Sequence, residues 1–443
     1  MPHLYSQDAH TFQLGQKIYW GSLYGSAQAL ALIEYVSAQQ QVVLLIANDI
    51  GHYNHLYKAL NFYNNDLDIL RFDNWEVLAF DHFSPHPDIT SNRLTTLSKL
   101  QDLKQGIVIT TLESLSQHLC PLEFSKKYSF SLESGDELEM HNFSEKLLKI
   151  GYHRVTTVME HGEFNIKGSL VDLYPMGAKS PYRIDLFDQE IESIRTFDPS
   201  TQRSIELIDQ ISLLPAREFA TDTTSIEVFK KNYLKAFNNT DDFIFTEVSE
   251  SRLPSGIEFY LSLFFNHTNT LFDYLPHNTV VATNQGFSTL VDQTYGDLHT
   301  RHKNAKRNLD MLPLDFDQCF LNKDQLFGEI KQRQQLLVGN SKLENNKHGI
   351  NFISKLLPPL RIEAQAKNPL AKFLNFTKKF KGRILIVCES EGRQSVLTDL
   401  LNNHQLTPLS VKHWQDFSSC KQTLCITNAN LSEGLLTNDI AII

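Results

Sequence analysis

Long apolar runs are missing from this sequence of 443 residues. The longest such run, residues 42–47, has six residues, whereas a helix that spans a membrane needs about twenty. The first eight residues have neither the basic start nor the apolar stretch of a secretory signal. We therefore predict a cytoplasmic protein without a membrane span.

Cysteine is scarce, and its spacing does not suggest pairing. The cysteines number five and form no Cys-x-x-Cys pair: Cys120, Cys319, Cys388, Cys420 and Cys425. An odd, scattered set argues against a disulfide scaffold and predicts reduced, mostly buried thiols. The histidines are mostly isolated, and metal sites usually need three or four converging ligands. We predict neither a metal site nor a cofactor for this chain.

Positive charge is in deficit. Lysine and arginine number 41 against 51 acidic residues, a formal net charge of −10. This balance opposes tight, sequence-independent binding of nucleic acid, because neutralising phosphates requires a basic face. We interpret the basic clusters 301–307 and 378–383 as solvated faces. A nucleic-acid-binding module that acts through these clusters is the alternative.

The length of 443 residues predicts about three domains, and the ordinary apolar and charged content predicts a folded protein. Residues 1–120 alternate between strands and helices, with a helix over 27–39 and buried strands over 42–47 and 106–111. Such alternation predicts a parallel sheet covered by helices, and hence an α/β fold. From residue 151 the hydrophobic period changes to that of antiparallel strands.

The boundaries follow from these changes of pattern. A strand over 279–283 is expected to rejoin the first sheet, so that the antiparallel segment is an insert in a split domain. The polar stretch 339–349 lacks periodicity and predicts a linker. We predict the following parts: 1–128, first half of the split domain; 129–215, insert; 216–336, second half; 337–350, linker; and 351–443, a small α/β third domain. The chain ends inside its last predicted strand, so we expect that this sequence is a piece of a longer protein.

The turn over residues 21–29 lies between a predicted strand and helix, where a phosphate-binding loop would lie. A working loop has the pattern GxxxxGK[ST]: its glycines let amides wrap phosphate, its lysine neutralises charge and its hydroxyl holds magnesium. Here the signature positions carry Ser22, Ala27, Gln28 and Ala29, with Gly25 between them. Nothing then stabilises the charge of phosphoryl transfer, so we predict no ATP hydrolysis. The alternative interpretation is an ordinary turn that caps the helix with Ser26.

The insert contains a candidate binding surface. Alternate residues of a strand share a face, so residues 181–187 divide into a core set and an outward set. The core set is Tyr182, Ile184 and Leu186, and the outward set is Arg183, Asp185 and Phe187. An exposed aromatic beside an arginine is typical of a protein-interface anchor.

The preceding segment adds a cation to this surface. We expect Phe164, Ile166 and Leu170 to share the core side, and Lys167 to point away from it and join the Arg183 surface. The alternative is that Phe187 packs under a loop and Lys167 is an ordinary surface cation.

Three stretches carry a resemblance to a known family: Met159–Gly177, Pro181–Asp188 and Ile191–Asp198. They closely resemble the transcription-repair coupling factor (Mfd) family and are similar, more distantly, to the UvrA-binding domain of the repair protein UvrB. Shorter family-like stretches are Trp75–Asp81, Phe83–His86, Leu214–Phe219 and Leu253–Glu258.

The resemblance implies a UvrB-like parallel-sheet domain with a degenerate phosphate-binding loop, interrupted by an antiparallel α+β UvrA-binding insert and followed by a small third domain. It implies UvrA contacts at Lys167, Arg183 and Phe187. Lys167 departs from the arginine that relatives often carry, which keeps the charge but removes a bidentate donor.

The resemblance also implies what a full-length family member adds. Such a protein is an ATP-dependent DNA translocase, using ATP and magnesium, that binds double-stranded DNA and stalled RNA polymerase. Its C-terminal regulatory domain masks the UvrA surface. This chain lacks those motor domains and resembles the docking and autoinhibitory portion, so we predict no enzyme activity. It also lacks the long hairpin of UvrB, so clamping a strand to verify damage is not expected. A UvrB-like, nucleotide-dependent DNA-remodelling enzyme is the alternative.

Overall fold

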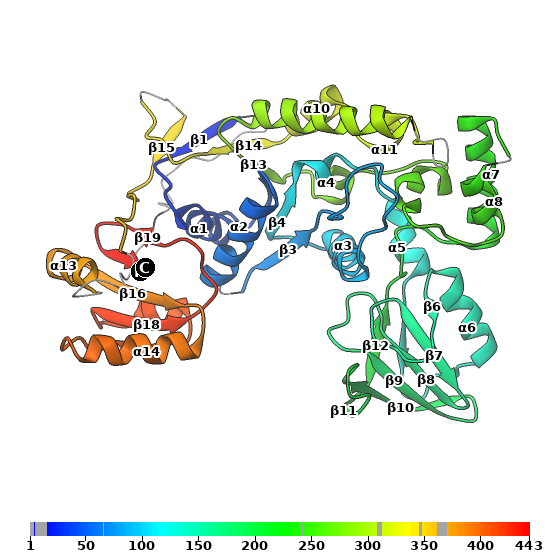
Figure 1. Cartoon of the computed structure of the whole chain (residues 1–443), viewed down its shortest axis with the longest axis horizontal. Coiled ribbons are helices and arrows are strands. Elements are labelled where there is room, and N and C mark those ends of the chain that lie inside the picture. The colour runs from blue at the N-terminus through cyan, green and yellow to red at the C-terminus, as the bar shows by residue number, and fades with distance from the viewer. Residues whose placement is uncertain are drawn as a thin grey trace.

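The computed structural model describes residues 4, 16–64, 66–240, 242–307, 312–344, 348–360 and 370–443 (Figure 1). Most of the N-terminal stretch and residues 345–347 of the predicted linker lie outside these ranges. No helix in the described ranges is long and apolar enough to cross a membrane.

Seven parallel strands form the sheet of the first domain, in the order β15-β1-β14-β13-β2-β4-β3. Their bounds are β1 Lys17–Gly21, β2 Val42–Ala47, β3 Asp68–Phe72, β4 Gly106–Thr111, β13 Val280–Asn284, β14 Gln334–Val338 and β15 Gly349–Asn351. Every residue of β2 and β4 is buried, as their uninterrupted apolar runs predict for a sheet covered on both faces. The pairing of β13 with β2 confirms that the chain returns to the first sheet after the insert.

Helices cover both faces of this sheet (Figure 1). One face carries α1 Ala27–Gln39 and α2 Ile50–Tyr63. The helices of the opposite core are α3 Pro87–Leu100, α4 Leu112–Ser116, α5 Leu122–Tyr128, α7 Thr223–Phe237, α8 Phe243–Ser249, the 3-10 helix η1 Ile257–Phe264, α9 Leu271–Tyr274, α10 Phe287–Ala305, α11 Phe316–Cys319 and α12 Lys323–Lys331. The α/β architecture predicted for this part is confirmed.

The predicted linker is partly built into the sheet. Strand β14 ends at Val338 and β15 begins at Gly349, and both pair with β1. The polar composition of 339–349 correctly predicts that residues 339–344 form neither helix nor strand. It gives no sign of the strands at its ends, because β15 has three residues, too few to show a period.

The insert is a six-stranded sheet in the order β11-β10-β9-β8-β7-β6, which is antiparallel apart from the β6–β7 pair. The strands are β6 His153–Arg154, β7 Glu163–Lys167, β8 Leu170–Leu173, β9 Tyr182–Phe187, β10 Glu190–Phe197 and β11 Ser204–Ile208. Helix α6 Met140–Lys149 packs on one face, and β5 Phe130–Glu133 pairs with β12 Gln210–Leu213 beside it.

One predicted side chain lies on the wrong face of this sheet. Leu170 is the cross-strand partner of both Lys167 and Asp185, so it shares their open face and not the core face of Phe164. The prediction treated residues 164–174 as one strand. The tight turn at Gly168, with φ of +62°, resets the alternation, and Val171 takes the core position instead.

The third domain is a five-stranded sheet in the order β17-β18-β16-β20-β19, in which β19 alone is antiparallel to its neighbour. Its strands are β16 Arg383–Cys388, β17 Leu409–Ser410, β18 Leu424–Asn428, β19 Leu435–Leu436 and β20 Ile440–Ile442. Its helices are α13 Ala371–Lys379, α14 Glu391–Asn402 and α15 Trp414–Ser419.

The third domain packs against the first. Residues from β16, α15, β18 and β20 belong to the same hydrophobic core as α1 and α2. The Trp414 ring meets the Tyr63 ring edge-on at 5.0 Å, and Gln415 Nε2 donates to the Asn64 carbonyl at 2.7 Å. The two domains therefore share one apolar interior, although the sequence between them reads as a linker.

Candidate protein-docking site

The open face of the insert sheet carries the predicted binding residues. Along β9, Ile184 and Leu186 are buried and Phe187 is 76% exposed. The exposure predicted for Phe187 is therefore confirmed, and the alternative in which it packs under a loop is wrong. An exposed aromatic of this size on a strand has the form of an interface anchor.

Arg183 lies deeper in the same face. Its Nε and Nη2 atoms donate to the two carboxylate oxygens of Asp172 at 2.7 and 2.9 Å, and Nη1 donates to the Gln202 carbonyl at 3.2 Å. The guanidinium carbon lies 4.9 Å from the centre of the Phe197 ring. Hydrogen bonding to Asp172 raises the pKa of Arg183, so this arginine is a fixed cation in the sheet.

Lys167 ends β7 on the same face and is exposed. It lies one cross-strand row from Arg183, because Lys167 pairs with Leu170 and Leu170 with Asp185. The structure therefore brings Lys167, Arg183 and Phe187 together on one surface. Their role in binding stays a prediction. Sequence reasoning missed Asp172, the partner of Arg183, because the two residues meet only once β8 and β9 are paired.

The predicted phosphate-binding turn lies far from the insert, between β1 and α1 (Figure 1). Ser26 occupies the N-cap position of α1 but makes no capping bond, so the capping alternative is wrong for its side chain. Its hydroxyl lies 2.7 Å from the hydroxyl of Tyr63 instead. Burial raises the pKa of Tyr63, which keeps that hydroxyl neutral.

The amides of this turn are hydrogen-bonded to other parts of the chain. The N–H groups of Ser22 and Leu23 donate to the carbonyls of Ser341 and Gly339 at 3.0 and 3.1 Å. The N–H of Tyr24 donates to Ser354 Oγ at 2.9 Å, and the N–H of Ser26 donates to the Gly434 carbonyl at 3.0 Å.

The lysine position of a working loop also carries no positive charge in this turn. Gln28, at the lysine position, has no hydrogen-bond partner for Nε2 among the described residues. Three segments of the chain thus contact the turn, at 339–341, Ser354 and Gly434, and the last two fall within residues 351–443.

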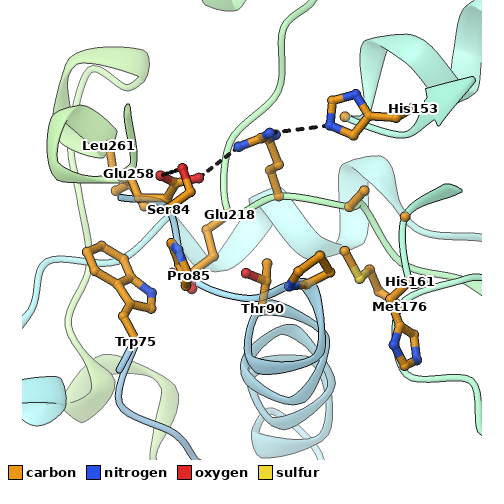
Figure 2. Close-up of a pocket in the computed structure, with 15 residues that line it drawn as sticks. Trp75, Ser84, Pro85, Thr90, His153, His161, Met176, Glu218, Glu258 and Leu261 are labelled. Atoms are coloured by element: carbon orange, nitrogen blue, oxygen red, sulfur yellow. Dashed lines mark hydrogen bonds and ion pairs between the residues drawn. The ribbon is translucent and has the colours of Figure 1, made fainter. Parts of the chain in front are cut away.

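A second polar cluster fixes the insert to the first domain around a cavity of about 260 Å³ (Figure 2). Arg217 donates from Nη1 to Glu258 Oε1 at 2.7 Å, and its Nη2 lies 3.3 Å from His153 Nε2. Ser84 Oγ donates to the second oxygen of Glu258 at 2.6 Å. On the far side of the cavity, His161 Nδ1 lies 2.7 Å from Asp88 Oδ1.

Three of these junction residues come from the short family-like stretches, to which no site was predicted. Ser84, Arg217 and Glu258 lie in three separate stretches, and their side chains converge here. The available signal was an arginine and two glutamates inside otherwise apolar stretches, at Arg217, Glu218 and Glu258. Within the described ranges, no group of three or more His, Cys, Asp or Glu side chains is placed to hold a metal ion.

Two protein families match parts of the chain. The family described as UvrB interaction domain matches residues 130–219, which contain the insert sheet and its open face. The family described as MFD, D3 domain, matches residues 376–443, which contain all five strands of the third-domain sheet.

The chain is similar over most of its length to transcription-repair-coupling factors. The chain is 33% identical over 419 residues to the one from Haemophilus influenzae and 34% identical over 417 residues to the one from Escherichia coli. These alignments cover 94% and 93% of this chain but 36% of each relative, so the chain spans about a third of their length. The factor from Rickettsia prowazekii is 28% identical over 329 residues. With its UvrB interaction domain and its D3 domain in place, this chain corresponds to the N-terminal region of the transcription-repair-coupling factors.

Proposed function

We propose that this chain is a docking module that binds the excision-repair protein UvrA through the open face of its insert. The observation that carries the proposal is Phe187, 76% exposed on the sheet that matches the UvrB interaction domain. Arg183 beside it is held rigidly by Asp172, so little conformational entropy is lost when a partner covers it. Lys167 supplies an exposed positive charge at the margin.

Binding of the chain to UvrA, measured by calorimetry, tests this proposal. Phe187→Ala is expected to weaken binding by about 2 kcal/mol or more, because an exposed aromatic anchor loses its contact area. Arg183→Ala is expected to weaken it similarly, since it also leaves Asp172 without its partner. Lys167→Ala should have a smaller effect because exposed charges contribute little.

Leu148→Ala is the matched control for these variants. Leu148 is 47% exposed on α6 of the same insert, and α6 packs on the sheet's other face. Its loss should leave binding unchanged. No binding by the unsubstituted chain, or equal weakening by Leu148→Ala, would contradict the proposal.

We further propose that the chain is not itself an enzyme and that its turn 21–29 is a degenerate phosphate-binding loop. Four amides of the turn already donate to Ser341, Gly339, Ser354 and Gly434, and Gln28 and Ala29 supply neither ammonium nor hydroxyl. Phosphate would have to displace those bonds without a lysine to attract it. No cofactor is therefore expected on this chain.

Titration with MgATP is expected to give no binding heat, and purified chain no ATP hydrolysis. The rival enzyme, a UvrB-like DNA remodeller, requires activity that disappears when residues 22–29 are altered. The rival nucleic-acid-binding module requires DNA binding that falls steeply with salt concentration. Either result would replace the docking proposal with the rival it supports.

For the longer protein, we propose that this region recruits UvrA to stalled RNA polymerase. The remainder would supply the ATP- and magnesium-dependent DNA translocase, the contact with RNA polymerase and a regulatory domain that masks the insert. The masking role fits an insert that leaves Lys167 and Phe187 exposed on its open face, with Phe187 its most exposed large apolar side chain.

A further inference from the structure

The outermost strand of the insert exposes two large apolar side chains, and one of them lies on the same face as Phe187. Ile205 and Leu207 in β11 are 63% and 69% exposed. Leu207 is the cross-strand partner of Arg195, and Arg195 is the partner of Arg183, so Leu207 points to the open face. Ile205 lies two residues away, where the β10–β11 register shifts, and its side chain is exposed on the same strand.

Strand β11 is also the free edge of its sheet. Among the described strands it pairs with β10 alone, and four of its five residues are exposed. Exposed edge strands usually carry charges that discourage pairing with another chain. This one carries a single charged residue, Glu206, between Ile205 and Leu207. Two large apolar side chains on an uncovered edge are typical of a surface that a partner protein covers.

The size of a stable interface points to the same strand. A specific complex of standard size covers about 800 Å² on each partner, a patch roughly 30 Å across. The span from β7 to β11 is about 19 Å, because neighbouring strands lie about 4.8 Å apart. A partner seated on Lys167 and Phe187 therefore reaches β11. The three predicted contacts are few beside the roughly 20–30 residues that each side of such an interface contributes.

A charged row connects the two apolar parts. Arg195 Nη1 lies 3.0 Å from Asp185 Oδ2, between Leu207 on one side and Phe187 on the other. The face thus has apolar residues at both ends and internally paired charges between them. Such a surface can be covered without leaving an unpaired buried charge.

We propose that UvrA covers the open face as far as the edge strand β11, with Ile205 and Leu207 as a second apolar contact beside Phe187. This inference rests on the proposed function, since it extends the same docking surface. The partner is expected to present apolar side chains to β11 and polar groups to the Asp185–Arg195 row.

The test is calorimetry of UvrA with the full chain and with Ile205→Ser and Leu207→Ser. Each substitution is expected to weaken binding at least about fivefold, and the double variant more than about twentyfold. Leu207→Met keeps the apolar contact and should bind like the unsubstituted chain. Because both residues are exposed, the variants should keep the thermal unfolding midpoint of the parent.

Ile353→Ser is the matched control, because Ile353 is also 63% exposed but lies outside the insert. Full binding by this variant, with loss in the β11 variants, would support the proposal.

If Phe187→Ala weakens binding while Ile205→Ser and Leu207→Ser do not, the extension to β11 is overturned and the docking function stands. If the unsubstituted chain does not bind UvrA, both fail. If the β11 variants abolish self-association of the chain but leave UvrA binding intact, a second copy is the occupant and the proposal is overturned.

Discussion

Glu218→Ala is expected to lower the free energy of unfolding by about 3–5 kcal/mol, because it leaves a fully buried arginine without its counter-ion. Arg93 is 0% exposed. Its Nε and Nη2 atoms donate to the two carboxylate oxygens of Glu218 at 2.5 and 3.2 Å. Nη1 donates to the Asp73 carbonyl at 3.0 Å, and the guanidinium lies over the Phe72 ring at 4.1 Å.

Urea denaturation of the chain and its variants measures this effect. Arg93→Met combined with Glu218→Leu should recover most of the loss, because an apolar pair of similar volume carries no uncompensated charge. Glu247→Ala serves as the surface control, since its ion pair with Arg252 is solvent-exposed and its loss should barely move the midpoint. A midpoint for Glu218→Ala equal to that of Glu247→Ala would show that the buried pair does not hold the junction together.

The second large effect is expected from Gly25→Ala, at the point where the third domain meets the turn before α1. Gly25 has φ of +57°, and a Cβ atom there would lie 2.2 Å from the Gly434 carbonyl oxygen. The left-handed conformation costs an L-residue about 1–2 kcal/mol, and forcing main chain apart costs about 1–3 kcal/mol more. We expect a total of about 3 kcal/mol, concentrated at the contact between the two domains.

Hydrogen exchange locates that loss. The Ser26 amide, which donates to the Gly434 carbonyl, should exchange faster in Gly25→Ala, and protease should release the third domain sooner. Gly168→Ala is the matched control: its φ is +62°, but nothing lies within 4 Å of the added Cβ. It carries the same backbone penalty without the clash. Equal protection of Ser26 in both variants would mean that the third domain is not held at this turn.

The first of these variants also bears on docking. Glu218 follows Arg217, whose guanidinium joins the insert to the first domain through His153 and Glu258. A loosened junction would change the orientation of the insert while leaving its open face intact. We therefore expect Glu218→Ala to bind UvrA with the affinity of the unsubstituted chain, even where its stability is reduced. That result would show that a mutation can change the stability of this chain without changing its binding.

Much of the fold follows from local patterns. The apolar runs 42–47 and 106–111 predict the buried parallel strands β2 and β4 at their observed bounds, and the helix over Ala27–Gln39 is found where its period predicts. Alternation along 181–187 separates the buried Ile184 from the exposed Phe187. These features are fixed by residues close together in the chain, so a single sequence contains them.

Features that depend on distant residues do not appear in such patterns. The sequence by itself determined an α/β protein with an antiparallel insert, and it placed Lys167, Arg183 and Phe187 on a candidate surface. Only the tertiary structure decided that Leu170 faces outward, that Asp172 holds Arg183, and that Leu207 extends the same face. It also decided that Gly434 of the third domain accepts a hydrogen bond from the turn before α1. The reason is physical: strand pairing and domain packing join residues tens to hundreds of positions apart, and no local periodicity records which of them will meet.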